Sequence, residues 1–286
     1  MKKYFLPYQL FLVFLHQNKQ QNKDNQYQNN NSILYQRIIT PILYPTPPQK
    51  KTLTINKSFD MQVEICCNSV LSARNAKLGG AYRIELCQAL NEGGTTPSAA
   101  AIEYCVKNLN LQTRVLIRPR SGNFVYDNED FKIILSDIQH AHKLGAHAVV
   151  FGFLTPNGDI DIEKTRIAVE TADGMDTTFH RAFDECRNPK EALEQVIDCG
   201  CSKLLTSGCM PSAEKGIPML RELVIQANGR IGIIAAAGIT PQNVSLIVNE
   251  TKVGQIHASC KKTIDNMIVT DTDTVRDLFN LTNLID

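Results

Sequence analysis

Hydrophobic and polar positions alternate regularly along the chain from Met61 onward. Short β-branched and apolar runs are separated by longer stretches whose apolar residues recur every three or four positions, which indicates strands alternating with amphipathic helices. The runs predict eight strands, over residues 62–66, 82–86, 114–118, 147–151, 175–179, 203–206, 230–235 and 254–258. The stretches between and after them predict eight helices, over 69–78, 98–109, 128–144, 161–172, 189–199, 212–227, 241–250 and 272–283.

Eight strand–helix units in about 225 residues match the size of a (β/α)8 barrel, which typically takes about 250 residues. The alternative is an open, doubly wound sheet, whose first turn usually carries a glycine-rich phosphate fingerprint. Here the first turn reads Cys66-Cys67-Asn68-Ser69 and contains no glycine. We therefore predict an α/β protein with the (β/α)8 TIM-barrel fold.

Residues 1–60 differ in composition from the rest of the chain. They hold eight Lys and Arg against two acidic residues, a net charge of +6, whereas residues 61–286 hold 22 basic and 27 acidic residues, a net charge of −5. Residues 17–31 are nearly all Gln, Asn and Lys, a composition that cannot bury enough apolar surface to fold. We predict a low-complexity, disordered extension over 1–60 and one barrel domain over 61–286.

Two other interpretations of the extension stay open. Lys2 and Lys3 precede an apolar run, as in a signal peptide, but Pro7 interrupts that run and no small-residue cleavage site follows it. Translation could also start at Met61, which would omit the extension altogether.

Composition narrows the class of protein further. No apolar run reaches the roughly 18 residues of a membrane-spanning helix, so we expect no membrane insertion. A net charge of +1 over the whole chain argues against a nucleic-acid partner. The nine cysteines are odd in number and scattered, which is untypical of a disulfide scaffold and favours the reducing cytoplasm.

Candidate chemistry gathers at the predicted strand ends, where barrels of this type carry their sites. The pattern Glu-apolar-Cys occurs on the first two strands, as Glu64 with Cys66 and Glu85 with Cys87. Residues two apart on a strand share a face, so the two pairs could meet inside the barrel. We expect Arg118 to pair with both carboxylates, and a buried ionic cluster without chemistry is the alternative.

The two cysteines of this pattern are candidates for a metal site. Thiolates select soft ions such as Cu(I) and Zn²⁺, and His180 or His257 could add a nitrogen ligand. The alternative is that Cys66 and Cys87 are simply small buried side chains, since free cysteine often packs as a hydrophobe.

A second set of residues fits catalysis on a small anion. His180 follows an apolar strand and is the candidate general acid or base, with Glu64 and Glu85 as further proton-transfer groups. Arg118 and Arg120 could clamp a carboxylate or a phosphate. The remaining candidate ligand-binding residues at the strand ends are Arg181, Asp184, His257 and Ser259. A histidine that only hydrogen-bonds into an ionic cluster is the alternative for His180.

Seven segments together resemble the CutC family. They are 63–69 (VEICCNS), 83–87 (RIELC), 92–98 (EGGTTPS), 117–122 (IRPRSG), 178–184 (TFHRAFD), 204–208 (LLTSG) and 254–259 (GQIHAS). The resemblance implies a cytoplasmic copper homeostasis protein with a (β/α)8 barrel, in which cysteines are proposed to bind Cu(I). The sequence departs from the family pattern in three places. The seventh strand ends in AAAG (235–238), Gln255 stands where an acidic residue is usual, and the segment 260–270 is short for the family.

Three hypotheses follow for the barrel. The first is copper homeostasis, with Cu(I) bound through Cys66 and Cys87 at the carboxyl-terminal mouth. The alternative is an enzyme acting on a small anionic metabolite, with His180 as general acid or base and Arg118 and Arg120 holding the anion. The third is an assembly or interaction module, which predicts a large exposed apolar patch. A homo-oligomer is compatible with all three.

Overall fold

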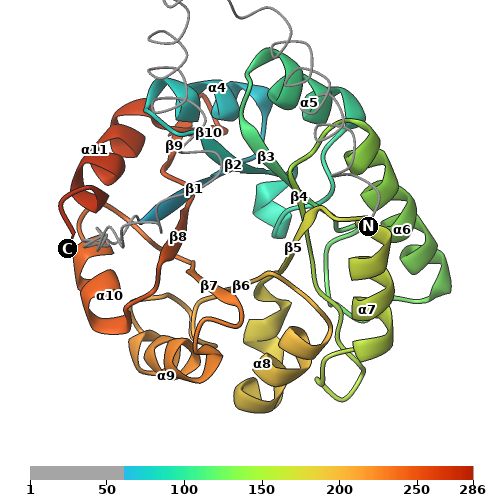
Figure 1. Cartoon of the computed structure of the whole chain (residues 1–286). Coiled ribbons are helices and arrows are strands. Elements are labelled where there is room, and N and C mark those ends of the chain that lie inside the picture. Colours follow the sequence, from blue (N-terminus) through green and yellow to red (C-terminus); the bar gives the residue numbers. More distant parts are fainter. Residues whose placement is uncertain (1–60, 286) are drawn as a thin grey trace, which may run out of the picture. The chain divides into compact units, whose positions relative to one another are not determined.

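Eight parallel strands close into a barrel in chain order, from β1 to β8, with β8 paired to β1. The structure is a computed structural model that describes residues 61–285. Figure 1 looks down the barrel, with the strands in the middle and the helices around them. The strands are β1 (Gln62–Cys67), β2 (Arg83–Leu86), β3 (Gln112–Leu116), β4 (Ala148–Phe151), β5 (Asp176–Phe179), β6 (Lys203–Thr206), β7 (Gly232–Ala235) and β8 (Gln255–Ala258).

A helix follows each strand, which confirms the predicted (β/α)8 barrel. The α-helices are α4 (Val70–Leu78), α5 (Ala99–Glu103), α6 (Asn128–Lys143), α7 (Ile162–Thr171), α8 (Pro189–Asp198), α9 (Ile217–Ala227), α10 (Val244–Thr251) and α11 (Thr272–Thr282). A π-helical turn, η3 (Tyr104–Asn108), continues α5, and two 3₁₀ turns, η2 (Leu90–Glu92) and η4 (Arg181–Glu185), follow β2 and β5. The expected extension over 1–60 and the last residue of the predicted domain lie outside the described residues.

Local capping explains where several helices begin. The Ser69 hydroxyl accepts a hydrogen bond from the Ser72 amide at the start of α4, and Ser98 accepts one from Ala101 at the start of α5. The predicted helix over 212–227 begins later than expected, at Ile217. Gly216 packs so closely on Ser207 that a Cβ at Gly216 would lie 1.8 Å from the Ser207 carbonyl oxygen, and the residues before it form a loop.

Strand β3 lies two residues earlier than predicted. It ends at Leu116, so Arg118 lies in the loop beyond the strand, whereas Arg114 lies inside the strand. The register pairs Arg114 with Glu85 of β2. This shift decides which arginine meets the interior carboxylates.

An antiparallel hairpin after β8 was not predicted. It consists of β9 (Lys261–Ile264) and β10 (Met267–Thr270), joined by Asp265 and Asn266, which both have positive φ as the tightest hairpin turns require. All four residues of β9 are exposed, so no buried alternation marks this strand in the sequence. The hairpin occupies the segment that looked short for the family.

The strands separate an apolar layer outside the barrel from a polar interior. Val63, Ile65 and Cys67 of β1 belong to the main core packed between the barrel and the helices. Glu64 and Cys66 alternate with them and face the inside. The predicted shared face of Glu64 and Cys66 is therefore present on β1, whereas in the second pattern Cys87 lies one residue beyond the end of β2.

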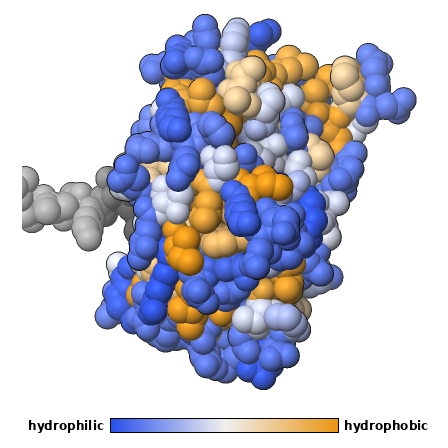
Figure 2. Space-filling view, turned by 90° about the vertical axis from the view of Figure 1, so that its right-hand side faces the viewer, coloured by the Kyte–Doolittle hydropathy of each residue, from blue (hydrophilic) through white to orange (hydrophobic). Residues whose placement is uncertain are grey.

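The surface has no single dominant apolar patch on the face that Figure 2 shows, which lies on the side of α6 and α7. Apolar residues there form small groups separated by hydrophilic residues. The large exposed apolar residues of the described chain are spread over different elements, among them Leu78, Ile133, Ile225 and Met267. This distribution does not favour the interaction-module hypothesis on that face. No helix within residues 61–285 is long and apolar enough to cross a membrane.

Candidate functional site at the barrel mouth

A cavity of about 990 Å³ opens at the carboxyl ends of the strands. Nine of the sequence-predicted site residues line it, namely Cys66, Glu85, Cys87, Arg118, His180, Arg181, Asp184, His257 and Ser259. Two do not: Glu64 lies buried in the barrel interior, and Arg120 lies in the loop after β3. The mouth is open rather than plugged, and its volume is in the range of small-molecule sites.

Cys66 and Cys87 form a pair of thiols in the wall of this cavity. Their sulfur atoms lie 3.9 Å apart, and both residues are buried. The hydrogen bond between them and their burial raise the pKa of Cys66 well above its ordinary value. Leu116 and Val150 form one buried apolar cluster with the two cysteines. Cys66 is therefore a protonated thiol at neutral pH.

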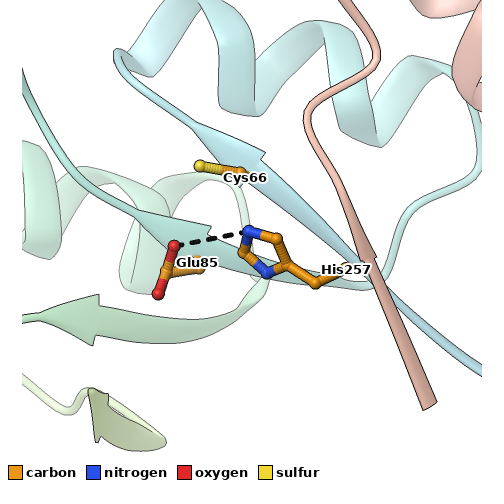
Figure 3. Close-up of side chains that lie close together, drawn as sticks. All are labelled: Cys66, Glu85 and His257. Atoms are coloured by element: carbon orange, nitrogen blue, oxygen red, sulfur yellow. Dashed lines mark ion pairs between the residues drawn. The ribbon is translucent and has the colours of Figure 1, made fainter. Parts of the chain in front are cut away.

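His257 lies between two carboxylates. Its Nδ1 is 2.8 Å from Oε1 of Glu64, and its Nε2 is 3.6 Å from Oε2 of Glu85. Figure 3 shows the contact with Glu85 and the Cys66 side chain beside it. Burial opposes a charge on the imidazole, but the Glu85 carboxylate and contacts with Cys66 and Glu64 raise the pKa of His257 well above its ordinary value. His257 is therefore an imidazolium at neutral pH.

The two carboxylates respond to this environment in opposite ways. Burial alone would raise the pKa of Glu64, but His257, Arg114 and Arg83 lower it to about 2. Burial raises the pKa of Glu85 more than the charge of His257 lowers it. Glu64 therefore stays ionised at neutral pH, because its pKa is lowered. Glu85 accepts a proton more readily than Glu64, because its pKa is raised.

The arginines that neutralise Glu64 are not the one predicted. Arg114 Nε lies 3.1 Å and Arg83 Nε 3.5 Å from Oε2 of Glu64, and all three side chains are buried. The expectation that Arg118 pairs with Glu64 and Glu85 was therefore wrong. The sequence contained the signal for the correct partners, because Arg83 and Arg114 have the same strand parity as Glu85 and Arg118.

Arg118 instead holds two loops together at the rim of the mouth. Its Nη1 donates to the carbonyl oxygens of Glu92 and Gly94, and its Nη2 donates to that of Gly122. Its guanidinium lies 5.0 Å from the ring centroid of Phe124. These contacts join the segments EGGTTPS and IRPRSG, and all the acceptors are neutral.

Arg120 and Arg181 are both engaged by carboxylates. Arg120 Nε lies 2.7 Å from Asp130 in α6, and its guanidinium stacks on Tyr126. Arg181 Nε lies 2.7 Å from Asp184. Arg120 is thus a loop residue with no access to the cavity, which counts against its predicted role of holding an anion there.

Asp184 connects the ends of β5 and β6. Its carboxylate accepts hydrogen bonds from the hydroxyl of Thr206 and from the backbone amides of Ser207 and Cys209. With Arg181 as a further partner, this carboxylate is saturated. Asp184 therefore shapes the rim of the cavity, and its oxygens are not available as a base.

His180 lines the cavity as a neutral ring with an unused donor. Its Nδ1 accepts a hydrogen bond from the amide of Ala182, so the ring proton lies on Nε2. Nε2 is buried and has no hydrogen-bond partner within the described chain. Burial and the charge of Arg118 lower the pKa of His180 to about 3. Gly152, the residue that directly follows β4, makes room for the His180 ring, since a Cβ at this position would lie 2.4 Å from Nδ1 of His180.

Fold and site together define a (β/α)8-barrel protein with a polar, open mouth that combines thiols, carboxylates, histidines and arginines. The profile of the CutC family matches residues 61–262. The chain therefore belongs to the CutC family, as the resemblance of its motifs implied.

Individual relatives agree with this assignment. A CutC family protein of Bacteroides fragilis is 47% identical over 202 residues, covering 70% of this chain and 80% of the relative. One of Vibrio vulnificus is 46% identical over 204 residues, covering 71% and 82%. The solved structure of a CutC from Streptococcus agalactiae, which bears a copper-homeostasis name, is 32% identical with a TM-score of 0.67, and covers 70% of this chain and 98% of that one.

Proposed function

We propose that this protein serves copper homeostasis by binding Cu(I) between the thiols of Cys66 and Cys87. The observation that carries the proposal is the 3.9 Å separation of two buried sulfur atoms in the wall of an open cavity. Thiolates are the ligands that select Cu(I), and the cavity gives the ion a path to them. The copper-homeostasis name of the Streptococcus agalactiae relative supports the same metal.

The other side chains near the thiols favour a site made of sulfur alone. Cys66, Glu85 and His257 offer ligand atoms within 4.8 Å of one another. His257 is an imidazolium held between carboxylates, so it has no free lone pair for a metal. Glu85 is a hard oxygen ligand that suits Cu(I) poorly. Because the pKa of Cys66 is raised, Cu(I) must displace thiol protons when it binds. The hydrogen bond from His257 to Cys66 lowers the pKa of this thiol and so favours its thiolate.

The experiment is an anaerobic titration of the full chain with Cu(I) against a competing chelator. We expect the Cys66→Ser, Cys87→Ser double variant to lose one high-affinity copper per chain. The matched control is Cys186→Ser, Cys209→Ser, which removes two other partly exposed thiols, one of them at the same mouth. Copper binding that persists in the first double variant, or that disappears only in the control, would exclude this site.

The cellular location belongs to the same proposal. All nine cysteines, which lie within the described residues, are free thiols. Free thiols persist in a reducing compartment, so we infer a cytoplasmic protein. Fractionation of cells that express the full chain tests this inference, and recovery of the chain from the secreted or membrane fraction would overturn it.

A second candidate function is favoured by the volume of the mouth, which far exceeds what one metal ion needs. In this alternative the barrel is an enzyme acting on a small anionic metabolite. The predicted role of His180 as a proton carrier fits poorly with its pKa of about 3. Glu85, with its raised pKa and its contact to His257, is the better candidate for moving a proton next to a carbonyl group.

Deuterium exchange tests the enzymatic alternative. The full chain is incubated in D₂O with a mixture of small 2-oxo acids, and incorporation of deuterium next to the carbonyl is followed by NMR. We expect exchange in the wild type and its loss in Glu85→Gln, with Glu222→Gln on the outer surface as the control. Equal exchange with and without the protein would rule this candidate out.

A further inference from the structure

One side of the mouth contains a buried positive charge that no carboxylate neutralises. Arg118 is only 5% exposed, and the ion pairs formed within residues 61–285 do not include it. Three of its N–H groups donate to backbone carbonyls, and its Nε has no partner. A buried guanidinium held only by neutral groups is costly unless an anion completes its environment.

The second unsatisfied donor is beside it. His180 is 5% exposed and presents an Nε2–H without an acceptor, while its Nδ1 is fixed by Ala182. The charge of Arg118 is felt at His180, where it disfavours protonation. The pair therefore offers a hydrogen bond from a neutral ring and the field of a fixed cation to the same region of the cavity, which both residues line.

Phe124 covers both groups. Its ring centroid lies 4.9 Å from that of His180 and 5.0 Å from the Arg118 guanidinium. The Phe124 ring thus contacts both donor-bearing side chains, and all three residues line the cavity. A carboxylate carries one negative charge and accepts through two oxygens, which matches one cation and one neutral donor, whereas phosphate carries more charge than this pair neutralises.

We propose that Arg118 and His180 form a subsite that binds the carboxylate of a small organic acid in the barrel mouth. The acid supplies the counter-charge for Arg118 and the acceptor for His180, while its remaining atoms extend into the 990 Å³ cavity toward the thiols and Glu85. The subsite differs from the predicted anion clamp, because Arg120 takes no part and His180 acts as a donor without changing its charge. The biological role of this subsite rests on the second candidate function, the enzyme acting on a small anionic metabolite. Binding of the carboxylate itself does not require that activity.

The test uses the copper-free full chain and pyruvate as the probe, with inorganic phosphate and chloride compared at equal ionic strength. Binding is followed by the ¹⁵N–¹H signal of His180 Nε2 and by calorimetry. We expect saturable binding of pyruvate at millimolar concentrations, weaker binding of phosphate, and a shift of the His180 signal. His180→Phe keeps a ring but loses the donor, so its affinity should fall by about 10- to 100-fold.

Controls separate this proposal from the others. Arg120→Lys changes an arginine of the same loop outside the cavity and should bind pyruvate like the wild type, whereas Arg118→Lys should bind it at least ~10-fold more weakly. Cys186→Ser, which changes a thiol that does not line the cavity, should also retain pyruvate binding. Binding without deuterium exchange supports the subsite and removes only the enzyme. No saturable pyruvate binding, equal affinity in folded His180→Phe, or tighter binding of phosphate would overturn the proposal.

Discussion

The two sides of the barrel mouth satisfy their polar groups in different ways. On the side of β1, β2 and β8, which we call the paired side, Glu64 is surrounded by Arg83, by His257 and by Arg114, which reaches it from inside β3. On the side of β3 and β5, which we call the open side, Arg118 has no carboxylate and His180 has no acceptor within residues 61–285. The charged groups on both sides are largely buried, so burial alone does not distinguish a structural ion cluster from a ligand site. The presence or absence of internal partners does.

The largest effect should come from breaking the paired side. Glu64→Gln leaves the buried Arg83 without its anion and removes the closer of the two carboxylates of Arg114, whose other partner, Asp176, lies 3.6 Å away, so we expect a loss of about 3–5 kcal/mol in the free energy of unfolding. Urea denaturation of the purified chain measures it. Glu222→Gln, which removes an exposed partner of Lys190, should cost less than about 1 kcal/mol. Equal costs for the two variants would mean that the paired side is not a neutralised cluster.

A smaller effect should follow from changing the open side. Arg118→Lys keeps the charge but loses the fork that holds three loop carbonyls, so we expect about 1–3 kcal/mol of destabilisation. Amide hydrogen exchange should accelerate around Gly94 and Gly122 and stay unchanged in β1. Uniform acceleration over the whole barrel would show that Arg118 supports the fold as a whole.

The two histidines should respond to pH with opposite signs. His257 has a raised pKa in the folded chain, so its contribution to stability is complete below the unfolded value of about 6.5 and is lost as the pH rises through its folded pKa. His180 has a folded pKa of about 3, so stability is lost as the pH falls from about 6.5 toward 3, because only the unfolded chain takes up that proton.

This prediction is checked by NMR and by denaturation. Neither ring should titrate near pH 6.5 in the folded chain, with His257 charged and His180 neutral on both sides of that value. Comparison of urea midpoints should show that His180→Phe removes part of the acid-side loss. An ordinary titration of either ring near pH 6.5 would contradict the contrast between the two sides.

The smallest effect is expected at Ser259, which lines the cavity next to the paired side. Ser259→Ala should change the free energy of unfolding by less than about 0.5 kcal/mol, since the fold does not depend on this hydroxyl. Thermal denaturation measures the change. A larger loss would mean that the paired side extends beyond its charged groups to the rim of β8.

The fold could be predicted because its signal is local and repeated. Each strand–helix unit alternates apolar and polar positions over a few residues, and the shared face of Glu64 and Cys66 follows from strand geometry alone. The hairpin of β9 and β10 gave no such signal, because its first strand is fully exposed. Its turn, Asp265-Asn266, also lacks the glycine that usually marks a tight hairpin.

The partners inside the barrel could not be predicted to the same degree. Adjacent strands are staggered, so Cys66 lies opposite Glu85 and Glu64 lies opposite His257, 193 residues away. Strand β3 ends at Leu116, so Arg118 lies beyond it, and Arg114, four residues earlier and inside the strand, is the partner of Glu64. The charge states of His180 and His257 depend on these long-range neighbours, whereas the clustering of site residues at the mouth depends only on the topology.

Gly152 shows how small a change in the sequence separates the open side from one without the His180 donor. The ring of His180 occupies the volume that any other residue at this position would fill with its first side-chain carbon. A single base change from a glycine to an alanine codon would therefore displace the imidazole without changing the identity of any candidate ligand-binding residue. Among relatives of this barrel, the small residue behind the histidine is therefore as informative about the proposed subsite as the histidine itself.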